Sequence, residues 1–134
     1  MKRTLLLVLA LAAGCSSSPD RIVQGTKYPT TAKHLASIDI QVFRRETEVE
    51  FTNTTARAFG PSTLWLNARF SHAIDGLAVG QSMRIPLKQF KDEFGDSFRG
   101  GGFFATERPD RLGLAEIQTG NEIVGLVVVG GDEL

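Results

Sequence analysis

The chain contains few side chains that could carry out chemistry. Its 134 residues include one cysteine, Cys15, and two histidines, His34 and His72. His72 follows Ser71 and precedes Asp75, but a catalytic triad requires a nucleophile held in a defined motif, and no serine of the chain lies in one. We therefore expect no catalytic residues, and the sequence predicts a protein that is not an enzyme.

An acidic cluster is the candidate for metal binding. Asp92, Glu93 and Asp96 lie close together in the sequence, and Asp110 follows further along. Calcium takes about six to eight oxygen ligands from closely spaced carboxylates and carbonyls, and this spacing matches no calcium-binding loop. The solvated face of a short helix is the favoured interpretation, so we expect no metal site and no cofactor.

A glycine-rich stretch with aromatic neighbours is the candidate contact surface. Residues 99–102, RGGG, superficially look like a phosphate loop, but two phenylalanines follow where a lysine and a hydroxyl are needed, so a turn with positive φ angles is favoured. Core filling is the favoured role for most of the nine phenylalanines. If the rings beside the glycines are exposed, they would form a contact site for a partner or for lipid. The candidate contact residues are Phe98, Arg99, Phe103 and Phe104.

The start of the chain is typical of an export signal. Residues 1–3 carry two positive charges, residues 5–13 form an apolar run of nine, and small residues directly precede Cys15. The run is shorter than the ~20 apolar residues of a membrane-spanning helix. We therefore predict a cleaved secretory signal.

Residues 11–15, LAAGC, resemble the signal-peptidase box of bacterial lipoproteins. The resemblance implies that residues 1–14 are removed and that Cys15 becomes a first residue carrying a diacylglycerol thioether and an amide-linked acyl chain. Such a residue anchors a protein to a membrane, because several acyl chains act together. Ser16, in place of an aspartate after the cysteine, indicates the periplasmic face of the outer membrane if the cell is Gram-negative.

Composition limits the partners and the number of domains. The chain has 42% apolar and 22% charged residues, which is typical of one globular domain. Without the signal, which includes Lys2 and Arg3, 13 basic residues stand against 15 acidic residues. Nucleic-acid binding requires clustered basic residues, so it is excluded as a function class. With its one cysteine at the signal boundary, the domain has no disulfide to stabilise it.

Period-two alternation predicts a mostly β domain over residues 37–134, after a lipidated, flexible tether over residues 15–36. A short helix is expected from Leu87 to Phe94, after Pro86. Residues 123–129 are apolar on both faces, which favours a central, buried strand, and a hairpin turn precedes them at residues 120–121. The alternation also predicts that Phe51 and Leu66 lie on the buried faces of their strands. The predicted strands cover residues 38–42, 48–52, 64–70, 83–87, 103–105, 112–119 and 123–129.

About seven short strands at regular spacing predict an antiparallel β-sandwich, with a small β-barrel as the alternative. Residues 49–55, VEFTNTT, and residues 74–87, IDGLAVGQSMRIPL, are similar to the immunoglobulin-like accessory modules of bacterial envelope proteins. This resemblance implies an immunoglobulin-like sandwich without the disulfide of antibody domains.

Two functional hypotheses follow from these observations. The first is a non-enzymatic, membrane-anchored envelope lipoprotein whose domain is a structural accessory module or binds a protein partner in the envelope. The alternative is an envelope protein that binds a small ligand or lipid, with the phenylalanine-rich region as the wall of its pocket. A deep pocket would favour the alternative, and an exposed aromatic patch would favour the first.

Overall fold

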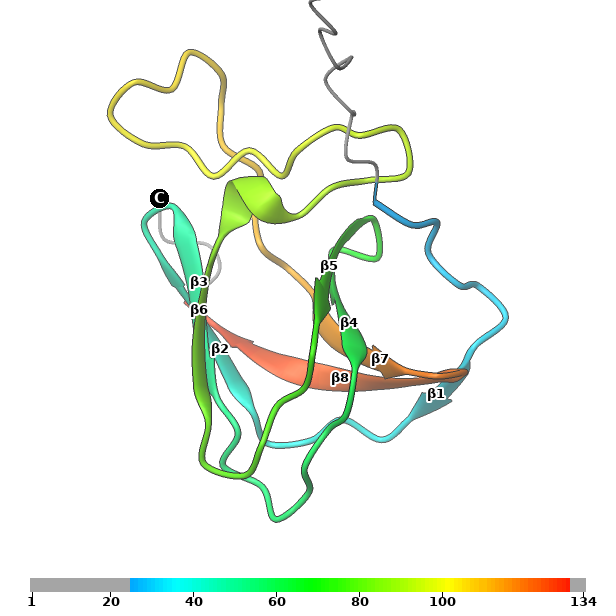
Figure 1. The fold of residues 1–134 in the computed structure, drawn as a ribbon. Helices are drawn as coiled ribbons and strands as arrows, with labels where there is room; N and C mark the ends of the chain where they lie inside the picture. The colour runs from blue at the N-terminus through cyan, green and yellow to red at the C-terminus, as the bar shows by residue number, and fades with distance from the viewer. Residues whose placement is uncertain (1–24, 131–134) are drawn as a thin grey trace, which may run out of the picture.

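Eight strands and one turn of 3-10 helix make up the described part of the chain, residues 25–130 of a computed structural model (Figure 1). The mostly β character predicted from the sequence is confirmed. Cys15 and the predicted signal lie outside the described residues. The elements are β1 Lys33–Leu35, β2 Gln41–Arg45, β3 Glu48–Thr52, β4 Ser62–Leu66, β5 Phe70–Ile74, β6 Ser82–Pro86, η1 Leu87–Gln89, β7 Ala115–Thr119 and β8 Glu122–Val129.

The strands form one curled sheet, a half-barrel, with the order β5-β4-β7-β8-β2-β3-β6 (Figure 1). The predicted sandwich is not confirmed, and the sheet is mixed where an antiparallel one was expected. β8 pairs antiparallel with β7, but its first residues pair in parallel with β1 and its last residues in parallel with β2. Alternation along one strand reports which face is buried and carries no information on the direction of the neighbouring strand.

Isolated backbone pairs connect β5 to the segment that follows β6 and η1, and the β3–β4 loop to the β5–β6 loop. Ser71 of β5 and Lys91, which follows η1, exchange N–H···O bonds of 2.8 and 3.0 Å. Phe59 and Leu77 exchange a second pair of 2.9 and 2.8 Å on the loops below. These bonds satisfy edge groups that would otherwise face solvent and hold the curl of the sheet.

The inner face of the sheet carries the core. Phe51 and Leu66 are 3% and 2% exposed, as the strand faces predicted. The other face of β4 is covered too, because Trp65 is 0% exposed. The β7–β8 hairpin turns at residues 120–121 as predicted, with Gly120 at φ 60°. Further core residues are Ile40, Val42, Val49, Leu64, Phe70, Ile74, Leu77, Ile85, Leu87, Phe90, Phe98, Leu112, Ile117, Val124 and Leu126.

Some predicted elements differ from the structure. The strand expected over residues 64–70 is divided into β4 and β5 by a turn in which Asn67 and Ala68 have φ angles of 53° and 52°. The Asn67 side chain stabilises this turn, because its Oδ1 accepts the N–H of Gly113 at 2.9 Å. The alternating pattern continues through the turn and so conceals it. No strand forms over residues 103–105.

The helix expected from Leu87 to Phe94 is limited to η1, Leu87–Gln89. Phe90 is already extended, with ψ 123°. Beyond it, the Asp92 side chain accepts the backbone N–H of Phe94 and of Asp96, at 3.0 and 2.9 Å. A carboxylate that binds nearby backbone N–H groups gives the chain an alternative to helical hydrogen bonds, which is why the spacing of apolar residues misled the prediction.

The domain begins earlier than predicted, because β1 joins the sheet and Tyr28 packs on the outer face of the sheet. The Tyr28 ring meets Trp65 edge-on at 5.1 Å, and its hydroxyl donates to Oε2 of the buried Glu116 at 2.9 Å. Burial, and then the hydrogen bond to Glu116, raise the pKa of Tyr28 to about 12. Residues 25–36 show no regular alternation of apolar and polar residues, and Tyr28 is held by the side chains of Trp65 in β4 and Glu116 in β7.

We predict that core truncation on the inner face is costly. Phe51→Ala and Leu66→Ala each leave a cavity in a dry core and should lower the free energy of unfolding by about 3 kcal/mol. Val79→Ala is the matched control, because Val79 is 56% exposed and its loss should stay within about 0.5 kcal/mol. Urea denaturation measures all three, and losses below about 0.5 kcal/mol at both core sites would contradict the packing described.

Candidate functional site

Two loops lie at one end of the half-barrel (Figure 1). The loop that follows η1 lies beside the start of the described chain, and the loop of residues 100–109 lies on the other side of the same end. They carry three large apolar side chains in solvent: Phe94 is 73%, Phe103 95% and Phe104 91% exposed. We call this group of Phe94, Phe103 and Phe104 the aromatic end. Exposed rings of this size gathered at one end of a small domain indicate a contact surface.

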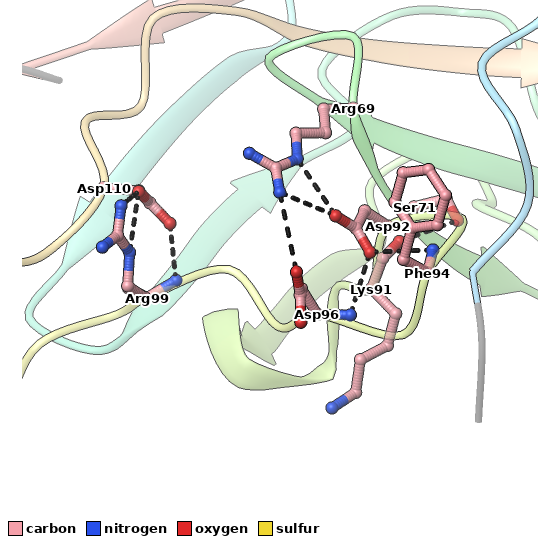
Figure 2. Close-up of polar contacts among 8 residues, drawn as sticks. All are labelled: Arg69, Ser71, Lys91, Asp92, Phe94, Asp96, Arg99 and Asp110. Atoms are coloured by element: carbon pink, nitrogen blue, oxygen red, sulfur yellow. Dashed lines mark hydrogen bonds and ion pairs between the residues drawn. The ribbon is translucent and has the colours of Figure 1, made fainter. Parts of the chain in front are cut away.

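An ion pair closes the loop that carries Phe103 and Phe104. Nη2 and Nε of Arg99 lie 2.6 and 3.1 Å from Oδ1 of Asp110, and the Arg99 backbone N–H donates to Oδ2 at 2.9 Å (Figure 2). The Asp110 N–H returns a bond to the Arg99 carbonyl at 2.9 Å. Such bidentate, charge-assisted contacts are among the stronger hydrogen bonds in proteins. The loop therefore emerges from a fixed base.

The charges of this pair support one another. The hydrogen bond to Asp110, and then its charge, raise the pKa of Arg99. Burial acts to raise the pKa of Asp110, but the hydrogen bonds and charge of Arg99 outweigh it, so the pKa is lowered. Both groups are therefore charged at neutral pH, and the ion pair persists at pH values around neutrality.

Arg44 of β2 fastens the same base to the sheet. Its Nη2 donates to the carbonyl of Gly100 at 2.8 Å, and its Nη1 donates to the carbonyl of Asp110. The guanidinium also lies 5.8 Å from the ring centre of Phe98. The two ends of the loop are thus held by one side chain of the core sheet.

The tip of the loop projects because glycines precede it. Gly101 and Gly102 have φ angles of 79° and 114°, so the expectation that this stretch needs positive φ is confirmed. Phe103 and Phe104 follow, with their rings edge to face at 5.0 Å. The two rings form one small apolar surface and pack on each other more than on the domain.

The structure separates the four predicted contact residues. Phe103 and Phe104 are almost fully exposed, and the Arg99 side chain is 53% exposed. Phe98, in contrast, is 1% exposed and meets Phe70 edge-on at 5.2 Å. Phe98 precedes Arg99, at which the loop begins, and its ring is part of the core.

Phe94 is the exposed ring that sequence reasoning missed. Its spacing from Leu87 and Phe90 placed it on the buried face of a helix that the structure does not contain. The available signal was Asp92, two residues earlier, followed by Gly95. An aspartate and a glycine around an aromatic residue are typical of a turn whose tip faces solvent.

The Asp92 carboxylate holds this second loop. Its side chain is 2% exposed, and Oδ2 accepts Nη2 and Nε of Arg69 at 2.7 and 3.1 Å (Figure 2). Its Oδ1 binds two N–H groups of the loop, and its backbone carbonyl accepts the N–H of Gly25 at 2.8 Å. The expectation that Asp92 lies on a solvated helix face is wrong. Burial acts to raise its pKa, but the bonds from Arg69, Asp96 and Phe94 outweigh burial and lower it.

The other residues considered for chemistry stay apart. Ser71 and His72 are neighbours in β5, so their side chains point to opposite faces of the sheet. The Ser71 hydroxyl accepts the N–H of Thr26 at 3.1 Å, and the His72 ring lies 5.3 Å from that of Phe90. Within residues 25–130, no group of three or more His, Cys, Asp or Glu is placed to hold a metal ion. The described helical turn is too short to cross a membrane.

A polar cleft of about 440 Å³ lies between the two ion pairs. Arg69 and Arg99 line this cleft. Each already forms an ion pair with a carboxylate of the protein, so a ligand in the cleft would have to compete with Asp92 and Asp110 for them. Phe70 is its only aromatic lining residue. The phenylalanine-rich pocket expected in the alternative function is not formed by Phe103 and Phe104, because rings more than 90% exposed wall no pocket.

We predict opposite effects at the two predicted contact phenylalanines. Phe98→Ser removes a buried ring and should cost about 3–5 kcal/mol of unfolding free energy, or more, because a hydroxyl replaces it. Phe104→Ser should stay within about 1 kcal/mol, as surface changes generally do. Thermal and urea melts of the two variants measure these losses. A Phe104→Ser variant that is unfolded, or as destabilised as Phe98→Ser, would show that this ring belongs to the core.

We predict an acid-sensitive contribution from Asp92. Because its pKa is lowered in the folded chain, the unfolded chain binds the proton more tightly, and stability falls as the pH drops below the ordinary carboxyl pKa of about 4. Asp92→Asn should lower the melting temperature at pH 7 and flatten this decline; Asp96→Asn, 76% exposed, is the control. Equal acid profiles for wild type and Asp92→Asn would contradict the assignment.

Comparison with known proteins returns no match: no family model, no curated protein and no solved structure is similar to this chain. The function proposed below is therefore supported by the residues of this chain alone.

Proposed function

We propose that the protein is a non-enzymatic, membrane-anchored lipoprotein of the cell envelope. It would be a structural accessory module that works through contacts made by the aromatic loop, the loop of residues 99–110 that carries Phe103 and Phe104. The anchor is the lipidated Cys15 implied by the LAAGC sequence. The contact surface is the loop between Arg99 and Asp110. Placement at the outer membrane, from Ser16, and the immunoglobulin-like resemblance both stay predictions, and the proposal depends on neither.

The exposure of Phe103 and Phe104, 95% and 91%, carries the contact proposal. A monomeric soluble domain gains nothing from two adjacent phenylalanine rings in water, and aromatic residues are enriched among those that dominate interface energies. The ring pair is also presented from a fixed base, because Arg99, Asp110 and Arg44 hold the two ends of the loop. A pre-ordered base lowers the entropy lost when the rings are covered.

The alternative, a binding pocket walled by phenylalanines, has less support. The described cleft beside the loop is polar and its arginines are already paired. Phe103 and Phe104 are more than 90% exposed and enclose no space, and Phe94 is the one phenylalanine that lines the cavity of about 300 Å³ beside Tyr28. A protein partner at the aromatic loop stays the prediction made from the sequence, and lipid is the other candidate for the same surface.

The anchor and the contact surface are tested together. In cells fed labelled palmitate, the wild type should carry the label and enter the detergent phase, and Cys15→Ser should lose both. Label that persists on Cys15→Ser would contradict the anchor. A photoreactive phenylalanine analogue in place of Phe104 should give adducts in the envelope, whereas the same analogue in place of Val79, an exposed control, should give none. Absence of adducts at both positions would contradict the contact surface.

A further inference from the structure

We propose that the aromatic end rests in the surface of the same lipid bilayer that holds the Cys15 anchor. Phe94, Phe103 and Phe104 would enter the boundary between headgroups and acyl chains. The inference rests on the proposed lipid anchor and names the partner of the contact surface. It follows from where the described chain begins, from the chemistry of the rings and from the charge of the loops that carry them.

The described chain begins at the aromatic end. The Gly25 N–H donates to the carbonyl of Asp92 at 2.8 Å, and Asp92 stands two residues before Phe94. Figure 2 shows Phe94 beside this start of the ribbon, and Figure 1 shows the loop of residues 100–109 at the same end of the half-barrel. Gly25 lies ten positions after Cys15 in the sequence, and this stretch of chain spans at most about 36 Å.

This placement selects the face turned toward the bilayer. An acylated Cys15 keeps the first described residue within a few tens of ångströms of the lipid surface. The tether therefore joins the domain at the end that carries the exposed rings and brings that end toward the membrane. The loop between β5 and β6 lies at the opposite end of the half-barrel (Figure 1), and Val79 in that loop is 56% exposed.

The rings suit a lipid boundary. Segments that lie on membranes bury phenylalanine, tryptophan and leucine side chains a short distance below the headgroups. Phe103 and Phe104 stand at the tip of a loop, edge to face at 5.0 Å, with glycines before them. A projecting pair of rings can enter a fluid interface directly, whereas a protein partner would have to supply a matching hollow. The tip geometry therefore favours lipid over protein.

The charge of the two loops is balanced. Residues 88–111 contain five Lys and Arg and five Asp and Glu. Asp110 is paired with Arg99 of the same loop, and Asp92 is paired with Arg69 of the turn between β4 and β5. Docking should therefore depend on the rings rather than on attraction to anionic headgroups, which requires an excess of basic residues. We expect the aromatic end to dock equally well on neutral and on anionic bilayers.

Tryptophan reporters in the acylated, full-length protein test the proposal. Trp65 is the only native tryptophan and is 0% exposed, so it gives a constant background. The variants are Phe103→Trp, Phe94→Trp and the control Val79→Trp, each checked for an unchanged melting temperature. They are reconstituted into phosphatidylcholine vesicles, or vesicles that also contain phosphatidylglycerol, with brominated acyl chains as quenchers.

We expect Phe103→Trp and Phe94→Trp to emit at shorter wavelength on the vesicles and to be quenched by brominated lipid, in both lipid mixtures. Val79→Trp should show neither the shift in emission nor the quenching when the protein binds vesicles. Unquenched reporters at 103 and 94, on protein that still floats with the vesicles, would overturn the inference and leave the anchor intact. Protein that fails to float would instead refute the anchor. Quenching on anionic vesicles alone would overturn the ring-driven docking, and a protein adduct at Phe104 with unquenched reporters would assign the rings to a protein partner.

Discussion

The carboxylate of Asp92 is the interaction on which this end of the domain depends. It is buried, and it binds the Arg69 guanidinium and two N–H groups of its own loop, while the Asp92 backbone carbonyl accepts the N–H of Gly25 at the start of the described chain. A buried charge is tolerated only when its hydrogen-bonding capacity is filled, and the partners of Asp92 come from three segments. The loop, the β4–β5 turn and the amino-terminal segment are therefore fixed together.

A second carboxylate, Asp110, works in the same way for the neighbouring loop. Together with Arg99 and Arg44 it holds both ends of the stretch that carries Phe103 and Phe104. Ion pairs at the bases of the two loops order the backbone, and the exposed apolar rings beyond these bases are available for contact. Such a loop has balanced charge and an ordered base. It is therefore suited to binding through insertion of its rings into an interface, and less to binding through long-range electrostatic attraction.

The errors of the sequence interpretation share one physical origin. The helix expected after Pro86 fails because Asp92 captures the N–H groups that a helix would need. The supposed tether folds because Trp65 and Glu116, far away in sequence, offer Tyr28 a surface. Phe98 and Phe104 look alike in the sequence, yet Phe98 packs in the core and Phe104 lies exposed in the loop that the Arg99–Asp110 pair closes.

By itself the sequence determined the β-rich character of the domain, most of its strand positions, the inward faces that bury Phe51 and Leu66, and the turn at residues 120–121. These properties follow from alternation and turn chemistry, which are local. Only the tertiary structure decided the parallel pairing of β8 with β1 and β2, the start of the fold before Ser37 and the exposure of the aromatic end. Each of these depends on hydrogen bonds and charges between segments distant in the chain, and no local pattern records them.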